Sequence, residues 1–142
     1  MNIEAILRTK GSEVVTVDCD TPLGEAVGLL AERRIGALPV MKDNRVVGII
    51  SERDVIYCLG RHGAEILDWP VERAMTTPTI TAELAMPVLA GLSLMTERRI
   101  RHLPVVDGGR LVGMVSIGDL VKYRMDRIEE EAAALRNYIQ MA

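Results

Sequence analysis

The stretch ERRIGALPV, from Glu32 to Val40, decides the fold because it recurs as ERRIRHLPV, from Glu97 to Val105. The offset between the two copies is 97 − 32 = 65 residues. At the same offset VVGIIS, from Val46 to Ser51, becomes LVGMVS, from Leu111 to Ser116. No gap is needed between residues 15 and 120. The sequence therefore predicts two similar units, and repeats this small are rarely stable alone.

The composition of the 142 residues narrows the class of protein. Apolar residues make up 49%, which excludes a disordered chain. The formal charge, 17 − 20 = −3, and an aromatic content of 3% argue against a nucleic-acid binder. The longest uncharged stretch, 84–96, is too short for a membrane span, and residues 1–4 do not resemble a signal peptide. Two cysteines cannot form a disulfide framework, so we expect a cytoplasmic protein with no membrane contact.

One repeat predicts the element order β-α-β-β-α. A β-branched run at 14–17 suits a short strand. Thr21 is expected to cap a helix whose first residue is Pro22, and Gly36 is expected to end it. Two strands should follow at 38–41 and 46–50, joined by a tight turn at 43–45.

The sequence also predicts the last strand and helix of the first repeat and the segment that connects it to the second. The run at 46–50 is continuously apolar, so we expect a central strand covered on both faces. Ser51 should open a helix that ends at Gly60. Residues 61–70 are expected to form a linker in which Trp69 is a packing anchor.

These repeats resemble CBS domains, and the pair resembles a Bateman module. The matching signatures are the L-P-V segments, the V-G-x-x-S-x-x-D segments and the strand followed by a Thr-Pro helix start. The resemblance covers about residues 3–123 and implies an α+β fold. In that fold two CBS repeats (1–66 and 67–124) pack with pseudo-twofold symmetry into a disc, and a C-terminal helix extension (125–142) follows. Relatives bind AMP, ADP, ATP, NAD or S-adenosylmethionine in clefts between the repeats, and others bind nothing known.

Two Ser-x-x-Asp motifs, Ser51 with Asp54 and Ser116 with Asp119, are the first candidate binding residues. One interpretation is a capping box, in which the Ser and Asp side chains satisfy backbone groups at a helix start. The other is that Asp accepts both hydroxyls of a ribose, while Ser and the first-turn N–H groups meet a phosphate. The resemblance implies that both acids occupy ribose-binding positions. A cap that opens when ligand arrives reconciles the two interpretations.

Arg101 and His102 replace Gly36 and Ala37 of the first repeat. They are interpreted either as a solvated helix end or as phosphate ligands. The resemblance implies that they serve the ligand whose ribose Asp54 holds, where His102 would make affinity pH-dependent. The cleft of Asp119 has Gly36 and Ala37 instead, and Lys10 is the candidate source of positive charge. We therefore predict unequal sites, with Asp54 preferring nucleotides and Asp119 binding weakly or preferring a less charged adenosine compound.

Val15 and Ile80 lie in the segments that enter the first strand of each repeat, 10–16 and 75–81. The resemblance implies that these segments line an adenine pocket. Ordinary strand packing explains the same residue types equally well.

The last helix departs from the repeat because it continues from Leu120 to Ala142 without Gly or Pro. Apolar residues in it are spaced 4, 3, 4, 3 and 4 apart, which is typical of a coiled-coil seam: Val121, Met125, Ile128, Ala132, Leu135 and Ile139. We expect a homodimer contact there. Packing on an N-terminal helix that carries Ile3, Ile6 and Leu7 is the alternative.

No catalytic or metal site is predicted. Cys58 and His62 are spaced i, i+4, but no third ligand follows. Cys58 is expected to be inert, and Cys19 to lie in a polar loop where a redox role stays open. The leading hypothesis is a non-enzymatic module that binds an adenine nucleotide and signals to an enzyme or transporter through its conformation or assembly. The alternative is a ligand-free homodimeric interaction scaffold.

Overall fold

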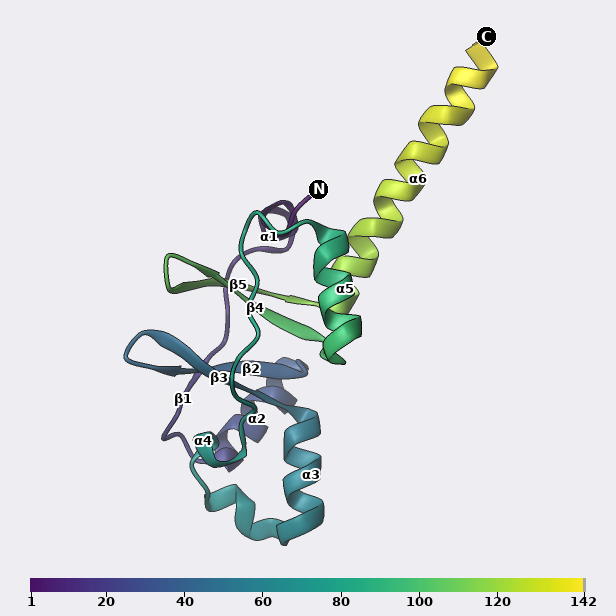
Figure 1. Cartoon of the computed structure of the whole chain (residues 1–142). Coiled ribbons are helices and arrows are strands. Elements are labelled where there is room, and N and C mark those ends of the chain that lie inside the picture. The colour runs from purple at the N-terminus through teal and green to yellow at the C-terminus, as the bar shows by residue number, and fades with distance from the viewer. Residues whose placement is uncertain (142) are drawn as a thin grey trace. The chain divides into compact units, whose positions relative to one another are not determined.

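The computed structural model describes residues 1–141 and has the expected mixture of helices and strands (Figure 1). The helices are α1 (Ile3–Lys10), α2 (Leu23–Arg33), α3 (Glu52–His62), the 3-10 helix η1 (Gly63–Asp68), α4 (Val71–Ala74), α5 (Val88–Arg98) and α6 (Ile117–Met141). The strands are β1 (Val17–Asp18), β2 (Ala37–Lys42), β3 (Arg45–Ser51), β4 (His102–Asp107) and β5 (Arg110–Ser116). Within these residues no helix has both the length and the apolar character needed to cross a bilayer.

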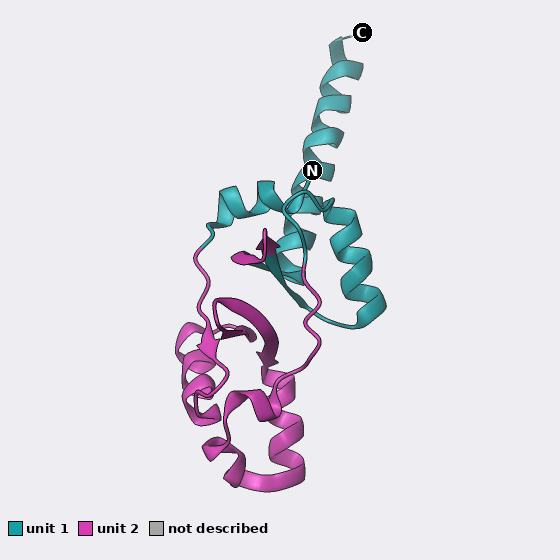
Figure 2. Cartoon of the chain, turned by 60° about the vertical axis from the view of Figure 1, so that its left-hand side comes forward, with its two compact units in different colours: residues 1–12, 82–105, 113–142 teal, residues 13–81, 106–112 magenta. Residues whose placement is uncertain are grey.

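The chain forms two compact units that do not follow its order in sequence (Figure 2). Unit 1 contains residues 1–12, 82–105 and the chain from 113 onward, and unit 2 contains residues 13–81 and 106–112. The N-terminal helix therefore belongs with elements of the second repeat. The domain boundaries after residues 66 and 124 follow the repeat in sequence and stay a prediction.

The sheet of unit 2 has the order β1-β2-β3, so β2 is its middle strand. Val17 of β1 pairs in parallel with Val40, and Ala37 at the start of β2 pairs in the antiparallel sense with Ser51. The prediction that 46–50 forms the central, doubly covered strand is wrong, because β3 lies at the edge and alternates between half-buried and buried side chains. The continuously buried strand is instead β2, over residues 37–40.

The core of unit 2 lies between this sheet and the helices around it. Leu23, Ala26 and Leu30 recur along α2 at helical spacing and turn one face of the helix to the sheet. The buried cluster consists of Val17, Leu23, Ala26, Leu30, Leu38, Val40, Ile50, Ile66, Val71 and Ala74. Val15, Cys19, Cys58 and Trp69 pack against it while staying partly exposed.

The strand predicted at 14–17 is shorter than expected, since only Val17 and Asp18 form β1. The second repeat reduces it further, to one parallel bridge between Ala82 and Val105. Ala82 and Val105 each lie 65 residues after Val17 and Val40, which form the corresponding pair in the first repeat. The repeat in the sequence is thus also a repeat of backbone pairing.

The start of α2 differs from the prediction. Pro22 is the N-cap, with an extended ψ of 137°, and Thr21 provides no side-chain cap. The backbone carbonyl of Thr21 instead accepts a hydrogen bond of 2.8 Å from the Val71 N–H. Pro87 is the N-cap of α5 in the same way. The proline therefore precedes the first turn rather than opening it.

The end of α2 also differs, because Gly36 does not stop the helix. Arg34 adopts the left-handed conformation, with φ 53° and ψ 47°, and its N–H donates to the carbonyl of Leu30. The Ile35 N–H bonds the same carbonyl, which is a Schellman-type ending. Arg99 ends α5 with φ 55°.

The turn predicted at 43–45 is confirmed, with Asp43 and Asn44 at φ 51° and 61°. In the second repeat Gly108 and Gly109 take the same positive-φ positions, where glycine carries no Cβ penalty. The tight connection between the two strands is thus kept by different residue types.

The segment predicted as a linker is part of unit 2. Helix α3 continues past Gly60 to His62, and Gly63, with φ 74°, ends it. The chain then forms η1, whose Ile66 is fully buried. Trp69 is confirmed as a packing anchor: its ring lies 4.9 Å from the His62 ring, and the Arg73 guanidinium carbon lies 3.8 Å from its centroid.

Unit 1 is built around α1, α5, α6 and most of β4 and β5. Ile3, Ile6 and Leu7 are buried on one face of α1. Gly113 of β5 permits this packing, because a Cβ there would lie 2.6 Å from Cδ1 of Leu7. Helix α6 contacts α5 and α1 near its start and then runs on past them (Figure 1).

The predicted continuous C-terminal helix is confirmed to Met141, and its predicted end at Ala142 lies outside the described residues. Leu120 is its one buried residue among those described, and five of the six seam residues are exposed.

Candidate functional site

The first candidate site is the junction between β3 and α3 in unit 2. Ser51 ends the strand and is the N-cap of the helix. Its Oγ accepts a hydrogen bond of 3.3 Å from the Asp54 N–H, and its own N–H donates to Oδ2 of Asp54 at 2.9 Å. The predicted capping box is therefore present. Ser51 Oγ also donates to Asp54 Oδ2 at 2.9 Å, so the N–H and the hydroxyl of Ser51 both hold the carboxylate at the helix start.

Thr76 holds the other oxygen of this carboxylate. Its Oγ1 donates to Oδ1 of Asp54 at 2.8 Å. Two backbone hydrogen bonds between Thr76 and Ile49, of 2.8 and 3.1 Å, hold the threonine beside the edge strand. Asp54 is thus half-buried with neutral hydrogen-bond donors on both oxygens.

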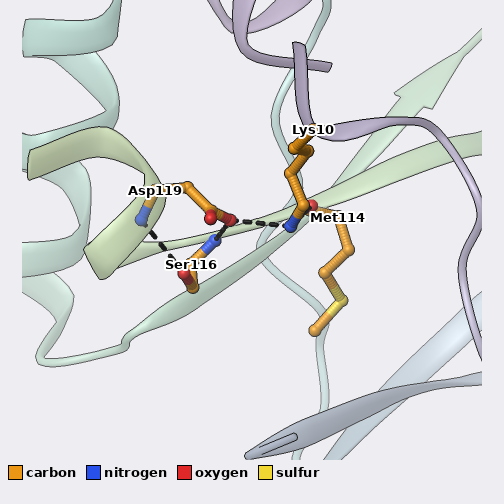
Figure 3. Close-up of polar contacts among 4 residues, drawn as sticks. All are labelled: Lys10, Met114, Ser116 and Asp119. Carbon is orange, nitrogen blue, oxygen red and sulfur yellow. Dashed lines mark hydrogen bonds and ion pairs between the residues drawn. The ribbon is translucent and has the colours of Figure 1, made fainter. Parts of the chain in front are cut away.

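The second candidate site, in unit 1, is the matching junction between β5 and α6 (Figure 3). The Ser116 N–H donates to Oδ2 of Asp119 at 2.8 Å, and the Asp119 N–H donates to Ser116 Oγ at 3.2 Å. Figure 3 shows Lys10 reaching the same carboxylate: its Nζ lies 2.7 Å from Asp119 Oδ2 and 2.9 Å from the Met114 carbonyl oxygen. The distant donor is thus a cation at Asp119 and a hydroxyl at Asp54, and Lys10 bonds the oxygen that also accepts from Ser116.

The pKa of Asp119 reflects this partner. Burial of the carboxyl group acts to raise the pKa, but the hydrogen bond from Lys10, the hydrogen bond from the Ser116 backbone and the charge of Lys10 together outweigh burial. The net pKa of Asp119 lies below its ordinary value. The carboxylate is therefore ionised at neutral pH and paired with an ammonium group.

Both junctions offer a carboxylate at a helix N-terminus, where backbone N–H groups also point toward a ligand. A carboxylate can accept about four hydrogen bonds, so the two hydroxyls of a cis-diol can replace or join the present donors. The donors differ between the sites, since Thr76 is neutral and Lys10 is charged. The arrangement suits recognition of a polyhydroxylated ligand.

Arg101 and His102 lie next to the second junction within unit 1. The Arg101 carbonyl accepts a hydrogen bond of 2.8 Å from the N–H of Ile117, the first residue of α6. In the first repeat the Gly36 carbonyl likewise accepts a hydrogen bond of 3.0 Å from the N–H of Glu52, the first residue of α3. His102 begins β4 and is half-buried. The assignment of both basic residues to a ligand held by Asp54 stays a prediction.

The remaining predicted residues fall into two groups. Ala37 is buried and pairs directly with Ser51 across the sheet, so it lies beside the first junction. Val15 and Ile80 are half-buried in irregular segments of unit 2, and Val15 packs against the core cluster. Their proposed contact with adenine stays a prediction.

Thr76 is the site residue that sequence reasoning did not single out. It lies one residue after Met75, and Met75 is the counterpart of Lys10 at the 65-residue offset. The usable signal is that both segments place a side-chain donor just before the ungapped alignment begins, at residues 15 and 80.

Both cysteines are free thiols. Cys19 is half-buried rather than exposed, and burial together with the Glu72 carboxylate raises the pKa of its thiol. A raised pKa disfavours the reactive thiolate. Cys58 is half-buried against the core cluster. Across residues 1–141, His, Cys, Asp and Glu side chains form no group of three or more that could hold a metal ion.

The CBS domain model matches residues 4–61 and again residues 71–126. The chain belongs to the CBS domain family. Among its relatives, the CBS domain-containing protein YhcV of Bacillus subtilis is 30% identical over 138 residues, which is 95% of each chain. The CBS-domain protein ATU1752 of Agrobacterium tumefaciens is 39% identical, with a TM-score of 0.84 over 87% of this CBS protein and 99% of that chain.

Two solved CBS structures contain adenosine compounds. The CBS pair of MJ0100, in complex with 5-methylthioadenosine and S-adenosyl-L-methionine, is 26% identical with a TM-score of 0.79, over 89% of this chain and 98% of that one. CBSX2 in complex with AMP is 25% identical with a TM-score of 0.75, over 88% of this chain and 96% of that one.

Proposed function

We propose that this CBS pair is a regulatory module that binds an adenosine-containing ligand and reports it through conformation or assembly. The observation that carries the proposal is the pair of equivalent junctions, in which Ser51 with Asp54 and Ser116 with Asp119 present a fixed carboxylate at a helix start. The relatives' ligands share a ribose, and a paired acceptor is the group that recognises its diol. The proposal names AMP, ADP, ATP, NAD and S-adenosylmethionine as the candidates.

The proposal includes unequal sites. Asp54 has neutral partners, so a ribose diol can replace the Thr76 hydroxyl without separating charges. Asp119 is paired with Lys10, so the lysine charge is already compensated and is less available to a phosphate. We infer that nucleotides prefer the site of Asp54, where Arg101 and His102 are proposed to supply the phosphate contacts. Asp119 is proposed to bind weakly or to prefer a less charged compound such as 5-methylthioadenosine.

A binding panel tests the proposal. The protein is unfolded and refolded to remove copurified ligand, and its melting temperature is then measured with AMP, ADP, ATP, NAD, S-adenosylmethionine and 5-methylthioadenosine. GMP and CMP are the controls. A ligand at 100 times its Kd stabilises the native state by about 2.7 kcal/mol, which raises the midpoint of a chain this size by several degrees. A rise with GMP and CMP as large as with AMP would refute adenosine recognition.

Asp54→Ala and Asp119→Ala assign the sites by calorimetric titration. Asp107→Ala, at the exposed end of β4, removes the same charge elsewhere and is the matched control. The expected result is that Asp54→Ala abolishes most AMP binding, whereas Asp119→Ala and Asp107→Ala leave it nearly unchanged. Equal losses in the first two variants would contradict the asymmetry, and loss in neither would contradict binding at these junctions.

The signalling half of the proposal requires that a ligand bind one conformation better than another. Trp69 is the sole tryptophan and contacts both His62 and Arg73, so its fluorescence reports rearrangement in unit 2. We propose an enzyme or a transporter as the recipient of the signal.

A second candidate function, a ligand-free homodimeric scaffold, is favoured by the exposed seam of α6. Met125, Leu135 and Ile139 are 58–63% exposed on a helix that runs past the other elements of its unit. Isolated exposed apolar side chains are ordinary, but a continuous row at heptad spacing is typical of an association surface. If no adenosine compound shifts the melting temperature, the scaffold becomes the better explanation.

A further inference from the structure

We infer that α6 associates with the α6 of a second copy of this chain as a parallel, in-register two-stranded coiled coil. The inference rests on the proposed self-association through the seam and adds its orientation and register. Placing Met125, Ala132 and Ile139 at heptad positions a puts Val121, Ile128 and Leu135 at positions d. The seam then spans 18 rises of 1.5 Å, or about 27 Å.

The charges beside the seam determine the direction. This heptad frame puts Arg124 and Glu131 at positions g, and Glu129 and Arg136 at positions e. In a parallel pair each g residue faces the e residue five positions later on the partner helix. Arg124 then faces Glu129, and Glu131 faces Arg136. By symmetry this gives four pairs of opposite charge, which flank the four inner apolar layers, those of Met125, Ile128, Ala132 and Leu135.

An antiparallel pair brings like charges together when the apolar residues of the two helices overlap completely. In an antiparallel pair, e positions face e positions and g positions face g positions. When residues 121 and 139 of the two copies meet, Glu129 faces Glu129, Glu131 faces Glu131 and Lys122 faces Arg136. Opposite charges meet only if the helices slide by one heptad, and a slide in either direction leaves two apolar residues of each helix outside the seam. Only the parallel pairing combines complete apolar overlap with attraction.

The seam residues have the exposure that this contact needs. Val121, Ile128 and Leu135, at positions d, are 41%, 48% and 60% exposed. Lys122, Glu129, Glu131 and Arg136 are exposed beside them, while Arg124 is half-buried. Because the seam is only about two and a half heptads long, the dimer should dissociate on dilution.

Charge reversal on the full chain tests the inference by sedimentation equilibrium. Glu129→Arg makes two like-charge pairs in the parallel dimer, and we expect self-association to weaken about tenfold, or about 1.4 kcal/mol. Arg124→Glu should weaken it similarly. The double variant, Arg124→Glu with Glu129→Arg, should restore it. Residues five apart on one helix do not face each other, so rescue within a single chain is not expected.

The double variant also separates the alternatives. In an antiparallel pair slid by one heptad it brings like charges together: the carboxylate introduced at position 124 faces Glu131, or the guanidinium introduced at position 129 faces Lys122 or Arg136. Association would then weaken further, which would overturn the inference. A wild-type monomer at high concentration would overturn both the inference and the proposed self-association. If Ile128→Asp with Leu135→Asp leaves the dimer intact, another surface makes it, and the inference is equally overturned.

A crosslink gives a second readout. Leu135→Cys, with Cys19→Ser and Cys58→Ser, should form an intermolecular disulfide on mild oxidation, because parallel in-register helices bring residue 135 opposite its own copy. Lys122→Cys, at an e position away from the symmetry axis, is the matched control and should crosslink poorly. Equal crosslinking by both variants would contradict the register, and no crosslinking at Leu135→Cys would contradict the parallel pairing.

Discussion

Removing the Lys10 ammonium should destabilise the protein because Asp119 loses its charged partner. Lys10→Met keeps the length of the alkyl chain and removes the charge. At the 2.7 Å separation of Nζ and Oδ2, Coulomb's law in water gives 332/(80 × 2.7), or about 1.5 kcal/mol. The side chains are 39% and 26% exposed, and ordering the lysine costs side-chain entropy. We therefore expect a loss of about 1 kcal/mol, at the upper end for partly exposed pairs.

The assay is thermal and urea unfolding at pH 7 and at about pH 3. A loss of about 1 kcal/mol should lower the midpoint by about 3 °C. Because the folded-state pKa of Asp119 is depressed, its stabilisation is fully present above the unfolded-state value of about 3.9. The stabilisation disappears as the pH falls through the lower folded-state pKa. The difference in stability between the wild type and Lys10→Met should therefore be full at pH 7 and smaller near pH 3.

Arg8→Met is the matched control, since it removes a cation from the same helix. Arg8 pairs with Glu4 at 2.9 Å, but the two side chains are 74% and 42% exposed, so we expect a loss of about 0.3 kcal/mol. The reasoning is refuted if Lys10→Met costs no more than Arg8→Met at pH 7. It is also refuted if the difference between the wild type and Lys10→Met is as large near pH 3 as at pH 7.

Three further predictions concern packing and the first junction. Thr76→Val should cost about 1 kcal/mol in urea unfolding, with no dependence on salt, because it removes a neutral hydroxyl donor from Asp54; a loss that shrinks in about 1 M salt would contradict this. Ile66→Ala should cost about 2–5 kcal/mol, whereas Leu67→Ala, at a residue 40% exposed, should cost under about 1 kcal/mol; similar losses would contradict a buried role for η1. Gly113→Ala should destabilise by about 1–3 kcal/mol through its contact with Leu7, and adding Leu7→Ala should remove most of that penalty, so strictly additive losses would contradict the contact.

The local parts of each site were predictable from sequence, and the long-range parts were not. The capping interactions of Ser51 with Asp54 and of Ser116 with Asp119 join residues three apart, so a motif contains all that is needed. Thr76 reaches Asp54 across 22 residues, and Lys10 reaches Asp119 across 109. Both donors lie before residues 15 and 80, where the ungapped alignment of the two repeats begins.

The errors in the predicted fold have similar physical causes. An apolar run is compatible with an edge strand that another segment covers, so 46–50 alone could not show that β2 is the middle strand. Gly36 suggested a helix end because glycine adopts the left-handed conformation without a steric penalty. The helices α2 and α5 instead end at Arg34 and Arg99, which adopt this conformation although their Cβ atoms make it less favourable. The polar stretch around Ile66 has no periodicity, and its burial depends on tertiary packing.

The two junctions show how a repeat can diverge in chemistry while keeping its backbone. Each carboxylate has the same serine cap, and each has one additional donor from a distant segment. At Asp119 that donor is Lys10, so the pair is neutral. At Asp54 the donors Ser51 and Thr76 are uncharged, so the carboxylate charge is not offset by these partners. An anionic ligand therefore needs cations from elsewhere at Asp54, and the proposed sources are Arg101 and His102, which replace Gly36 and Ala37 of the first repeat. The proposed preference of nucleotides for Asp54 thus depends on both substitutions together, and Arg101→Gly with His102→Ala should reduce binding of AMP more than binding of uncharged 5-methylthioadenosine.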